Sequence, residues 1–226
     1  MCFVPKISLT TAIFEFLVAA WSYYHYPKNK LINFFVSTLV LLGLYQFTEY
    51  MLCTSNNIQL WGKIGFIIYT VIPANMVFCL SQLGKKQKIN YLLFLPSLIF
   101  VIYALIDTEF ILYGTCSTLF VSIANKFTSY NYNMINALVY QEYYFFYIAI
   151  IAIHLIRRIK KHKNKEEVIT SVLIIITSLF IIIPLLILII ILPSISIKFA
   201  SIYCQFVMLF TLTALIGLYL ENKIKN

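Results

Sequence analysis

Long apolar runs alternate with short polar loops along the whole chain. The runs cover Ile7–Tyr26, Leu31–Cys53, Leu60–Leu83, Tyr91–Ile106, Tyr140–Ile156, Val168–Leu192 and Lys198–Leu220. Most of them are close to the roughly 20 apolar residues that an α-helix needs to cross a bilayer. They lack the period-2 alternation of a transmembrane barrel, and lipid offers no partner for open strands. The pattern predicts an all-α integral membrane bundle of seven transmembrane helices, forming a single domain over residues 1–226.

Composition supports the bilayer as the solvent of this protein. Hydrophobic residues make up 62% of the chain and charged residues 11%, whereas soluble domains have about 45–50% and about 25%. The formal net charge of +9 would suggest nucleic acid in a soluble domain. Here the basic residues stand in short loops between apolar runs, where they indicate topology. Lipid is therefore the expected partner, and nucleic acid is not.

The basic residues also predict orientation. One set of alternate loops carries most of them: Lys28, Lys30, Lys85, Lys86, Lys88, Arg157, Arg158, Lys160, Lys161, Lys163, Lys165, Lys223 and Lys225. The opposite loops and helix ends carry Lys6, Lys63, Lys126 and Lys198. Because Lys and Arg accumulate in short cytoplasmic loops, we expect the carboxyl terminus inside and the amino terminus outside.

The longest connection, residues 107–139, is expected on the outer side. It mixes Phe and Tyr with Ser, Thr and Asn, and is too apolar for a disordered linker. Two interpretations are equally compatible with it. It forms either a lid over a ligand site or an ordered cap or hairpin at headgroup level.

Polar side chains inside the helices are the candidate site. Ser8, Thr11 and Glu15 share one helical face, Gln46 and Glu49 share another, and the last helix carries Ser201, Cys204 and Gln205. At the predicted orientation all of them lie in the outer half of the bilayer. One interpretation is an outward-facing ligand pocket; the other is that the carboxyls and amides hydrogen-bond to each other and hold the helices together.

The cysteines suggest further chemistry. If Met1 is removed, Cys2 presents an amine and a thiol together, a pair suited to nucleophilic catalysis or, with Cys204, to binding a soft metal. Cys2, Cys53, Cys116 and Cys204 are all expected outside, where two of them could pair, for example tying the long loop to a helix end. No cofactor is predicted. Pro73 is expected to kink its helix and free backbone carbonyls for a neighbouring group.

Three short stretches carry a resemblance. Met1-Cys2-Phe3, Gln46-x-x-Glu49 and Ser201-x-x-Cys204 resemble an uncharacterised family of small prokaryotic seven-helix membrane proteins that begin Met-Cys-Phe-Ser. This chain has Val4 where that Ser would stand. The resemblance implies a prokaryotic cell membrane and one constellation of Cys2, Gln46, Glu49 and Cys204, but no reaction. The stretch from Trp61 to Pro73 is more weakly similar to the seven-helix sensor region of some histidine kinases.

Three functions are compatible with these features. The first is a sensor or receptor-like module that binds a ligand or ion in the outer pocket, with a cytoplasmic protein partner at Arg157–Lys165. The second is a secondary transporter that uses Glu15 and Glu49 as proton or cation sites. The third is an intramembrane enzyme with Cys2 as its nucleophile, and we expect the protein not to be an enzyme.

Overall fold

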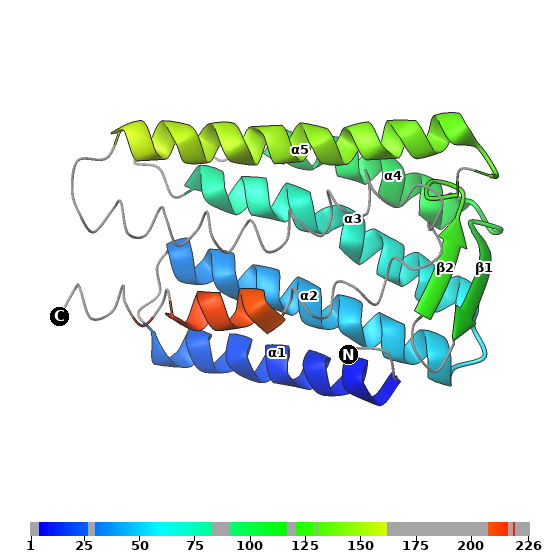
Figure 1. Ribbon diagram of the computed structural model, residues 1–226, viewed down its shortest axis with the longest axis horizontal. Helices are drawn as coiled ribbons and strands as arrows, with labels where there is room; N and C mark the ends of the chain where they lie inside the picture. The colour runs from blue at the N-terminus through cyan, green and yellow to red at the C-terminus, as the bar shows by residue number, and fades with distance from the viewer. Residues whose placement is uncertain are drawn as a thin grey trace.

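The protein is a bundle of long helices with a small β-hairpin across one end. The computed structural model describes residues 5–26, 30–82, 91–116, 121–129, 131–161, 208–216 and 219. Its elements are α1 (Pro5–His25), α2 (Lys30–Thr54), α3 (Ile58–Gln82), the 3₁₀ turn η1 (Tyr91–Phe94), α4 (Leu95–Ile106), β1 (Ile111–Cys116), β2 (Val121–Asn125) and α5 (Met134–Lys161). Residues 208–216 form a further short helix. The long helices run side by side with roughly parallel axes (Figure 1).

Four helices are long and apolar enough to cross a membrane: Pro5–His25, Ile32–Thr54, Ile58–Ser81 and Met134–His154. They correspond to the first, second, third and fifth predicted spans. The fourth predicted span, Tyr91–Ile106, is apolar but shorter. These elements make the protein a mostly helical membrane bundle.

The rest of the predicted topology stays a prediction. The sixth expected span, 168–192, lies outside the described residues. Of the seventh, 198–220, only 208–216 and 219 are described, and 208–216 is helical. The count of seven spans and the sides of the two termini are therefore not fixed by the structure.

Asparagine caps set two helix starts. The Asn57 side-chain oxygen accepts from the backbone N–H of Leu60 at 3.0 Å, at the start of α3. Asn133 does the same for Ile135 at 3.0 Å and Asn136 at 3.2 Å. These bonds satisfy donors that have no partner within the first helical turn. They place the start of α5 at Met134 rather than at Tyr140, so the long connection is shorter than predicted.

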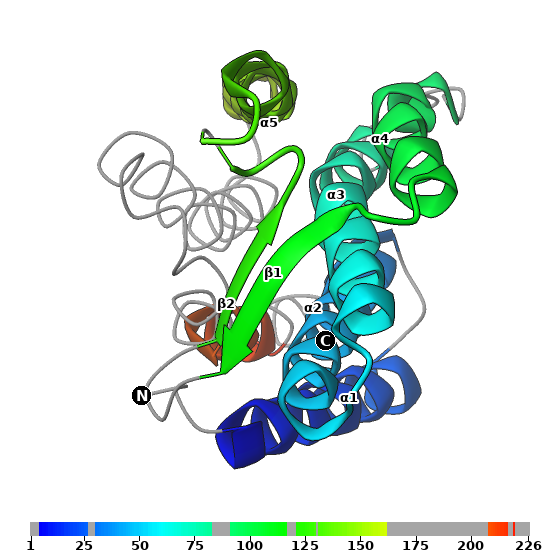
Figure 2. The ribbon, with the colours of Figure 1, turned by 90° about the vertical axis from the view of Figure 1, so that its right-hand side faces the viewer.

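The connection between α4 and α5 contains a two-stranded antiparallel hairpin. β1 pairs with β2 from Ile111 opposite Asn125 to Cys116 opposite Val121, with one irregularity between Ile111 and Tyr113. Asn125 ends β2, because its side-chain oxygen accepts from the N–H groups of Phe127 and Thr128. Figure 2, which looks at the hairpin end of the bundle, shows the hairpin lying across the ends of the helices.

Aromatic rings form the core between α3, α4, α5 and the hairpin. The ring of Phe127, which follows β2, packs edge-on against Phe100 of α4 with centroids 5.1 Å apart and stacks on Phe66 of α3 at 6.0 Å. Tyr140 of α5 stacks on Phe66 at 5.2 Å and meets Phe100 edge-on at 5.0 Å. Offset and edge-on ring contacts add about 0.5–1.5 kcal/mol each beyond area burial. The base of the hairpin is thus part of the main core.

Candidate functional site

The polar faces of α1 and α2 are buried in the bundle. Ser8, Thr11 and Glu15 of α1 are exposed by 1%, 6% and 0%, and Gln46 and Glu49 of α2 by 0% and 1%. Carboxyl groups in this position are costly unless they are hydrogen-bonded or neutral. The two helices therefore bury two carboxyls and an amide inside the bundle.

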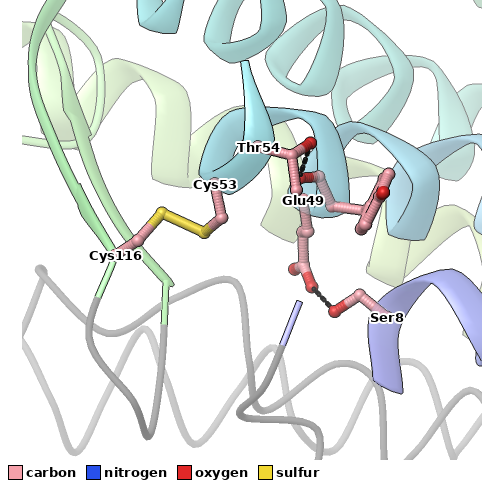
Figure 3. Close-up of a disulfide and its surroundings, with 6 residues drawn as sticks. Ser8, Glu49, Cys53, Thr54 and Cys116 are labelled. Atoms are coloured by element: carbon pink, nitrogen blue, oxygen red, sulfur yellow. Dashed lines mark hydrogen bonds between the residues drawn. A yellow bond between two sulfur atoms is a disulfide. The ribbon is translucent and has the colours of Figure 1, made fainter. Parts of the chain in front are cut away.

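A hydrogen bond joins the two faces directly. Ser8 Oγ donates to Glu49 Oε2 at 3.3 Å. In Figure 3 the Glu49 side chain extends from α2 toward Ser8, close to the end of α2 that carries Cys53. Glu49 and Cys53 are one helical turn apart, so the buried carboxyl lies just beneath the hairpin end of the bundle.

A disulfide between Cys53 and Cys116 ties the hairpin to α2 (Figure 3). It is one of the pairings that the sequence left open, and it joins the long connection to a helix end. Beside it a small apolar cluster packs Val121 of β2 against Leu52 of α2. The tip of the hairpin is thus held on α2 by a covalent bond and a few apolar contacts.

The base of the hairpin is held on α3 by polar contacts. Gln59 binds the backbone of Ile111 twice, donating from Nε2 to the carbonyl at 2.6 Å and accepting from the N–H at 3.3 Å. Lys63 Nζ donates to the Asp107 carbonyl oxygen. Gly62 allows this approach, because an added Cβ there would lie 2.9 Å from Ile111 Cγ1. The described part of the connection is therefore attached to two helices, α2 and α3.

An ion pair joins the segment before β1 to the segment after β2 at the base of the hairpin. Lys126 Nζ lies 2.7 Å from Asp107 Oδ2, and both side chains are largely shielded. The hydrogen bond from Lys126 lowers the pKa of Asp107 below its ordinary value, and the N–H of Glu109 adds to the effect. The same hydrogen bond raises the pKa of Lys126. Both groups are therefore charged over a wide pH range.

A cavity lies under the hairpin, between α2 and α3. Its volume is ≈ 50 Å³, and its described walls are Tyr45, Thr48, Glu49, Leu52, Gly62, Gly65, Phe66, Tyr69, Ile123, Asn125 and Thr128. Gly65 lets Thr48 of α2 pack closely against α3 at the wall of the cavity, since a Cβ there would lie 2.9 Å from Thr48 Oγ1. The cavity combines one carboxyl, hydroxyl and amide groups, and aromatic rings. It has room for a ligand of only a few heavy atoms or for water.

Part of the predicted site lies outside the described residues: Cys2, Ser201, Cys204, Gln205 and residues 162–165, the end of the basic segment. The proposed constellation of Cys2, Gln46, Glu49 and Cys204, and the metal role of Cys2 and Cys204, stay predictions for that reason. Over the part of the chain that is described, no three His, Cys, Asp or Glu side chains are grouped closely enough to hold a metal ion.

Several walls of the cavity were not identified from sequence. Thr48, Asn125 and Thr128 look like ordinary helix and loop residues until β2 is placed beside α2. One local signal was available, because Gly62 and Gly65 lie one turn apart on α3, and small residues let neighbouring groups approach a membrane helix closely. The sequence did not indicate which residues this close approach would bring together.

No protein-family model matches the sequence, and no curated protein or solved structure matches it significantly. The resemblance to small prokaryotic seven-helix membrane proteins thus stays a prediction based on the few positions quoted for it.

Proposed function

We propose that the protein is a receptor-like membrane module that binds a small ligand or ion in the hairpin-capped cavity, with Glu49 as its main polar group. The observation that carries the proposal is the position of Glu49. Its side chain is 1% exposed, yet it contributes to a cavity between α2, α3 and the hairpin. Ionisable groups buried in membrane helices are expensive, and they typically mark ligand sites, ion sites or proton relays.

The disulfide supports an outward-facing site. Disulfides form and persist in oxidising environments, outside the cytoplasm, and Cys53–Cys116 lies at the hairpin end of the bundle. The distribution of basic residues assigns that same end to the outer side. Two independent features thus favour a cavity that is loaded from outside.

The size of the cavity limits the range of ligands that it can hold. A volume of ≈ 50 Å³ accommodates a partly dehydrated cation or a molecule of a few heavy atoms. A signal from it would leave at the opposite end, where α5 carries Arg157 and meets a cytoplasmic partner or anionic lipid.

Binding is tested with the full-length protein in nanodiscs. Thermal unfolding is measured with a panel of alkali and alkaline-earth chlorides, ammonium and small amino acids at matched ionic strength. A ligand at 100 times its Kd stabilises the folded state by about 2.7 kcal/mol. We expect at least one member to raise the melting temperature of the wild type and to lose this effect in Glu49→Gln. Glu142→Gln is the matched control, because Glu142 is exposed on α5.

A secondary transporter is the second candidate, favoured by the presence of two buried carboxyls, Glu15 and Glu49. It predicts pH- or substrate-dependent flux in proteoliposomes, followed with an entrapped pH dye or a labelled panel member. Binding without flux supports the receptor. Flux that Glu49→Gln abolishes and Glu142→Gln preserves would replace it with the transporter.

A further inference from the structure

Helix α3 stays helical through Pro73, but its backbone hydrogen-bond ladder is broken there, one turn below the cavity. Pro73 lies inside it, and proline has no N–H to offer to the carbonyl four residues earlier. That carbonyl belongs to Tyr69, and the neighbouring carbonyl of Thr70 lies at the same break. Membrane helices tolerate such breaks where a neighbouring group binds the released carbonyls.

Tyrosine hydroxyls of α5 supply that neighbouring group. Tyr144 Oη donates to the Tyr69 carbonyl at 3.0 Å, and Tyr143 Oη donates to the Thr70 carbonyl. Tyr140 Oη and Thr70 Oγ1 are 2.7 Å apart and share a further hydrogen bond. The α5 hydroxyls thus bind α3 carbonyls in the turn before Pro73, as the expectation of freed carbonyls implies, and the kink itself stays a prediction.

The Tyr144 hydroxyl has a second hydrogen-bond partner nearby. Tyr144 Oη also lies 3.4 Å from Tyr140 Oη. A small shift of α5 would let the Tyr144 hydroxyl exchange the Tyr69 carbonyl for the Tyr140 hydroxyl. The net free energy of one hydrogen bond is small, because its loss is offset by the bond that replaces it. A modest change in α3 is therefore enough to shift the balance between the two arrangements.

The broken turn also forms a wall of the cavity. Tyr69 and Phe66 both line it, and Tyr69 faces Tyr45 of α2 with ring centroids 6.2 Å apart. A group that fills the cavity therefore pushes on the residue whose carbonyl Tyr144 binds. On the other side, α5 continues as one helix to Lys161, well past the end of its apolar part at His154.

We propose that the Pro73 break and the hydroxyls of Tyr143 and Tyr144 form the coupling element of this protein. Occupancy of the cavity moves the Phe66–Tyr69 turn, the Tyr144 hydrogen bond transmits that movement to α5, and the basic end of α5 is displaced. This inference rests on the proposed function, because it describes how binding in the same cavity is transmitted to α5.

The test replaces the unidentified ligand with side chains that fill the cavity. Gly65→Ala adds a methyl group between Gly65 and Thr48, and Thr48→Leu fills the same space from α2. Gly43→Ala is the matched control. Its added Cβ also meets a side chain at 2.9 Å, but that side chain is Phe16 on α1, away from the cavity.

Movement of α5 is measured by pulsed electron spin resonance on the full chain in nanodiscs. Nitroxides are attached through unnatural amino acids at Tyr24 and Ile156, exposed by 84% and 53%, which leaves all native cysteines in place. Each cavity variant is measured alone, with Tyr144→Phe and with Tyr147→Phe. Tyr147→Phe is the control on α5, because its hydroxyl binds the Leu93 carbonyl and not α3.

We expect Gly65→Ala and Thr48→Leu to shift the Tyr24–Ile156 distance by on the order of 2 Å, and Gly43→Ala to leave it unchanged. Tyr144→Phe should abolish the shift and Tyr147→Phe should preserve it. No shift with either cavity variant, an equal shift with Gly43→Ala, or an equal shift in Tyr144→Phe would each overturn the coupling. Ligand binding is not needed for this result, so its failure is distinguishable from failure of the proposed function.

Discussion

Helix α3 is held on its two sides by different kinds of contact. Toward α2 several contacts join small or polar side chains, beside the ring pairs Tyr45–Tyr69 and Phe47–Trp61. Asn75 Nδ2 donates to Ser37 Oγ at 3.1 Å, the Cys79 thiol lies 3.6 Å from the same oxygen, and Gly65 admits Thr48. Toward α5 the contacts are large rings, and the hydrogen bonds run from side-chain hydroxyls to backbone carbonyls.

The two sides of α3 differ in the contacts that hold the helices together within the bilayer. Lipid tails are as apolar as leucine, so helices associate through close packing and hydrogen bonds and not through a hydrophobic effect. On the α2 side the helices approach closely because Gly65 lacks a side chain. On the α5 side, tyrosine rings lie against α3, and their hydroxyls reach the Tyr69 and Thr70 carbonyls in the turn before Pro73. The first side holds polar side chains that a ligand can meet, whereas the second binds the backbone itself.

The largest expected effect comes from removing a ring on the α5 side. Tyr140 is 3% exposed, and its ring contacts Phe66, Phe100 and Phe127. Tyr140→Ala should lower the free energy of unfolding by about 3–5 kcal/mol, the usual cost of deleting a buried ring. Equilibrium unfolding in mixed detergent micelles measures it.

Two variants separate the ring from the hydroxyl. Tyr140→Phe keeps the ring and loses the bond to Thr70, so it should cost only about 1 kcal/mol. Phe146→Ala removes a ring that is 52% exposed on the same helix and should cost much less than Tyr140→Ala. Equal losses in Tyr140→Ala and Phe146→Ala would show that the α5 side is not held by a ring core.

These contacts also show what the sequence could reveal. The bounds of α1, α2 and α3 follow from apolar runs, because a bilayer imposes length and composition on each crossing. The predicted span began too late, at Tyr140, although Met134–Val139 is apolar apart from Asn136 and the cap residue Asn133 was a readable signal. The apolar run and the cap together mark the start of α5 at Met134.

The sequence did not predict which helices and strands pack against each other. Tyr140, Tyr143, Tyr144 and Tyr147 form a recognisable stripe at helical spacing, and Pro73 was expected to free carbonyls. No local sequence feature connects the tyrosine stripe with Pro73, because their contact depends on α5 packing beside α3. The cavity is a similar case. Glu49 was a candidate from its depth, whereas Asn125 became a wall only through the register of β2.

A smaller effect is expected on the α2 side. The hydrogen bond between Asn75 and Ser37 joins two side chains, and such pairs between membrane helices average about 0.6 kcal/mol. A double-mutant cycle of Asn75→Ala and Ser37→Ala, measured by the same unfolding assay, should return a coupling near that value. A cycle of Asn75→Ala with Thr10→Ala should return none, because the Thr10 hydroxyl donates to the Lys6 carbonyl of its own helix. A coupling as large as the loss in Tyr140→Ala would remove the contrast between the two sides.

The smallest effect belongs to the ion pair at the hairpin base, which lies outside both sides of α3. Lys126 lowers the pKa of Asp107, so its stabilisation is present above the ordinary Asp value of about 3.9 and is lost as the pH falls through the lowered pKa. The raised pKa of Lys126 means that the same pair persists below about pH 10 and is lost only at higher pH. Between these limits the pair should contribute a small, constant stabilisation.

Lys126→Met isolates that contribution. Its melting temperature should lie slightly below that of the wild type at pH 6, and the difference should close as the pH falls through the lowered pKa of Asp107, below which Asp107 is neutral in both proteins. Lys6→Met is the control, because it removes an exposed lysine on α1 and leaves the Lys126–Asp107 pair in place, so its difference from the wild type should not follow this pH dependence. A difference for Lys126→Met that stays constant over the whole acid range in which Asp107 titrates would mean that the lysine acts through its contact with Tyr132 and not through its pair with Asp107. In that case the base of the hairpin would not depend on the charge of Asp107.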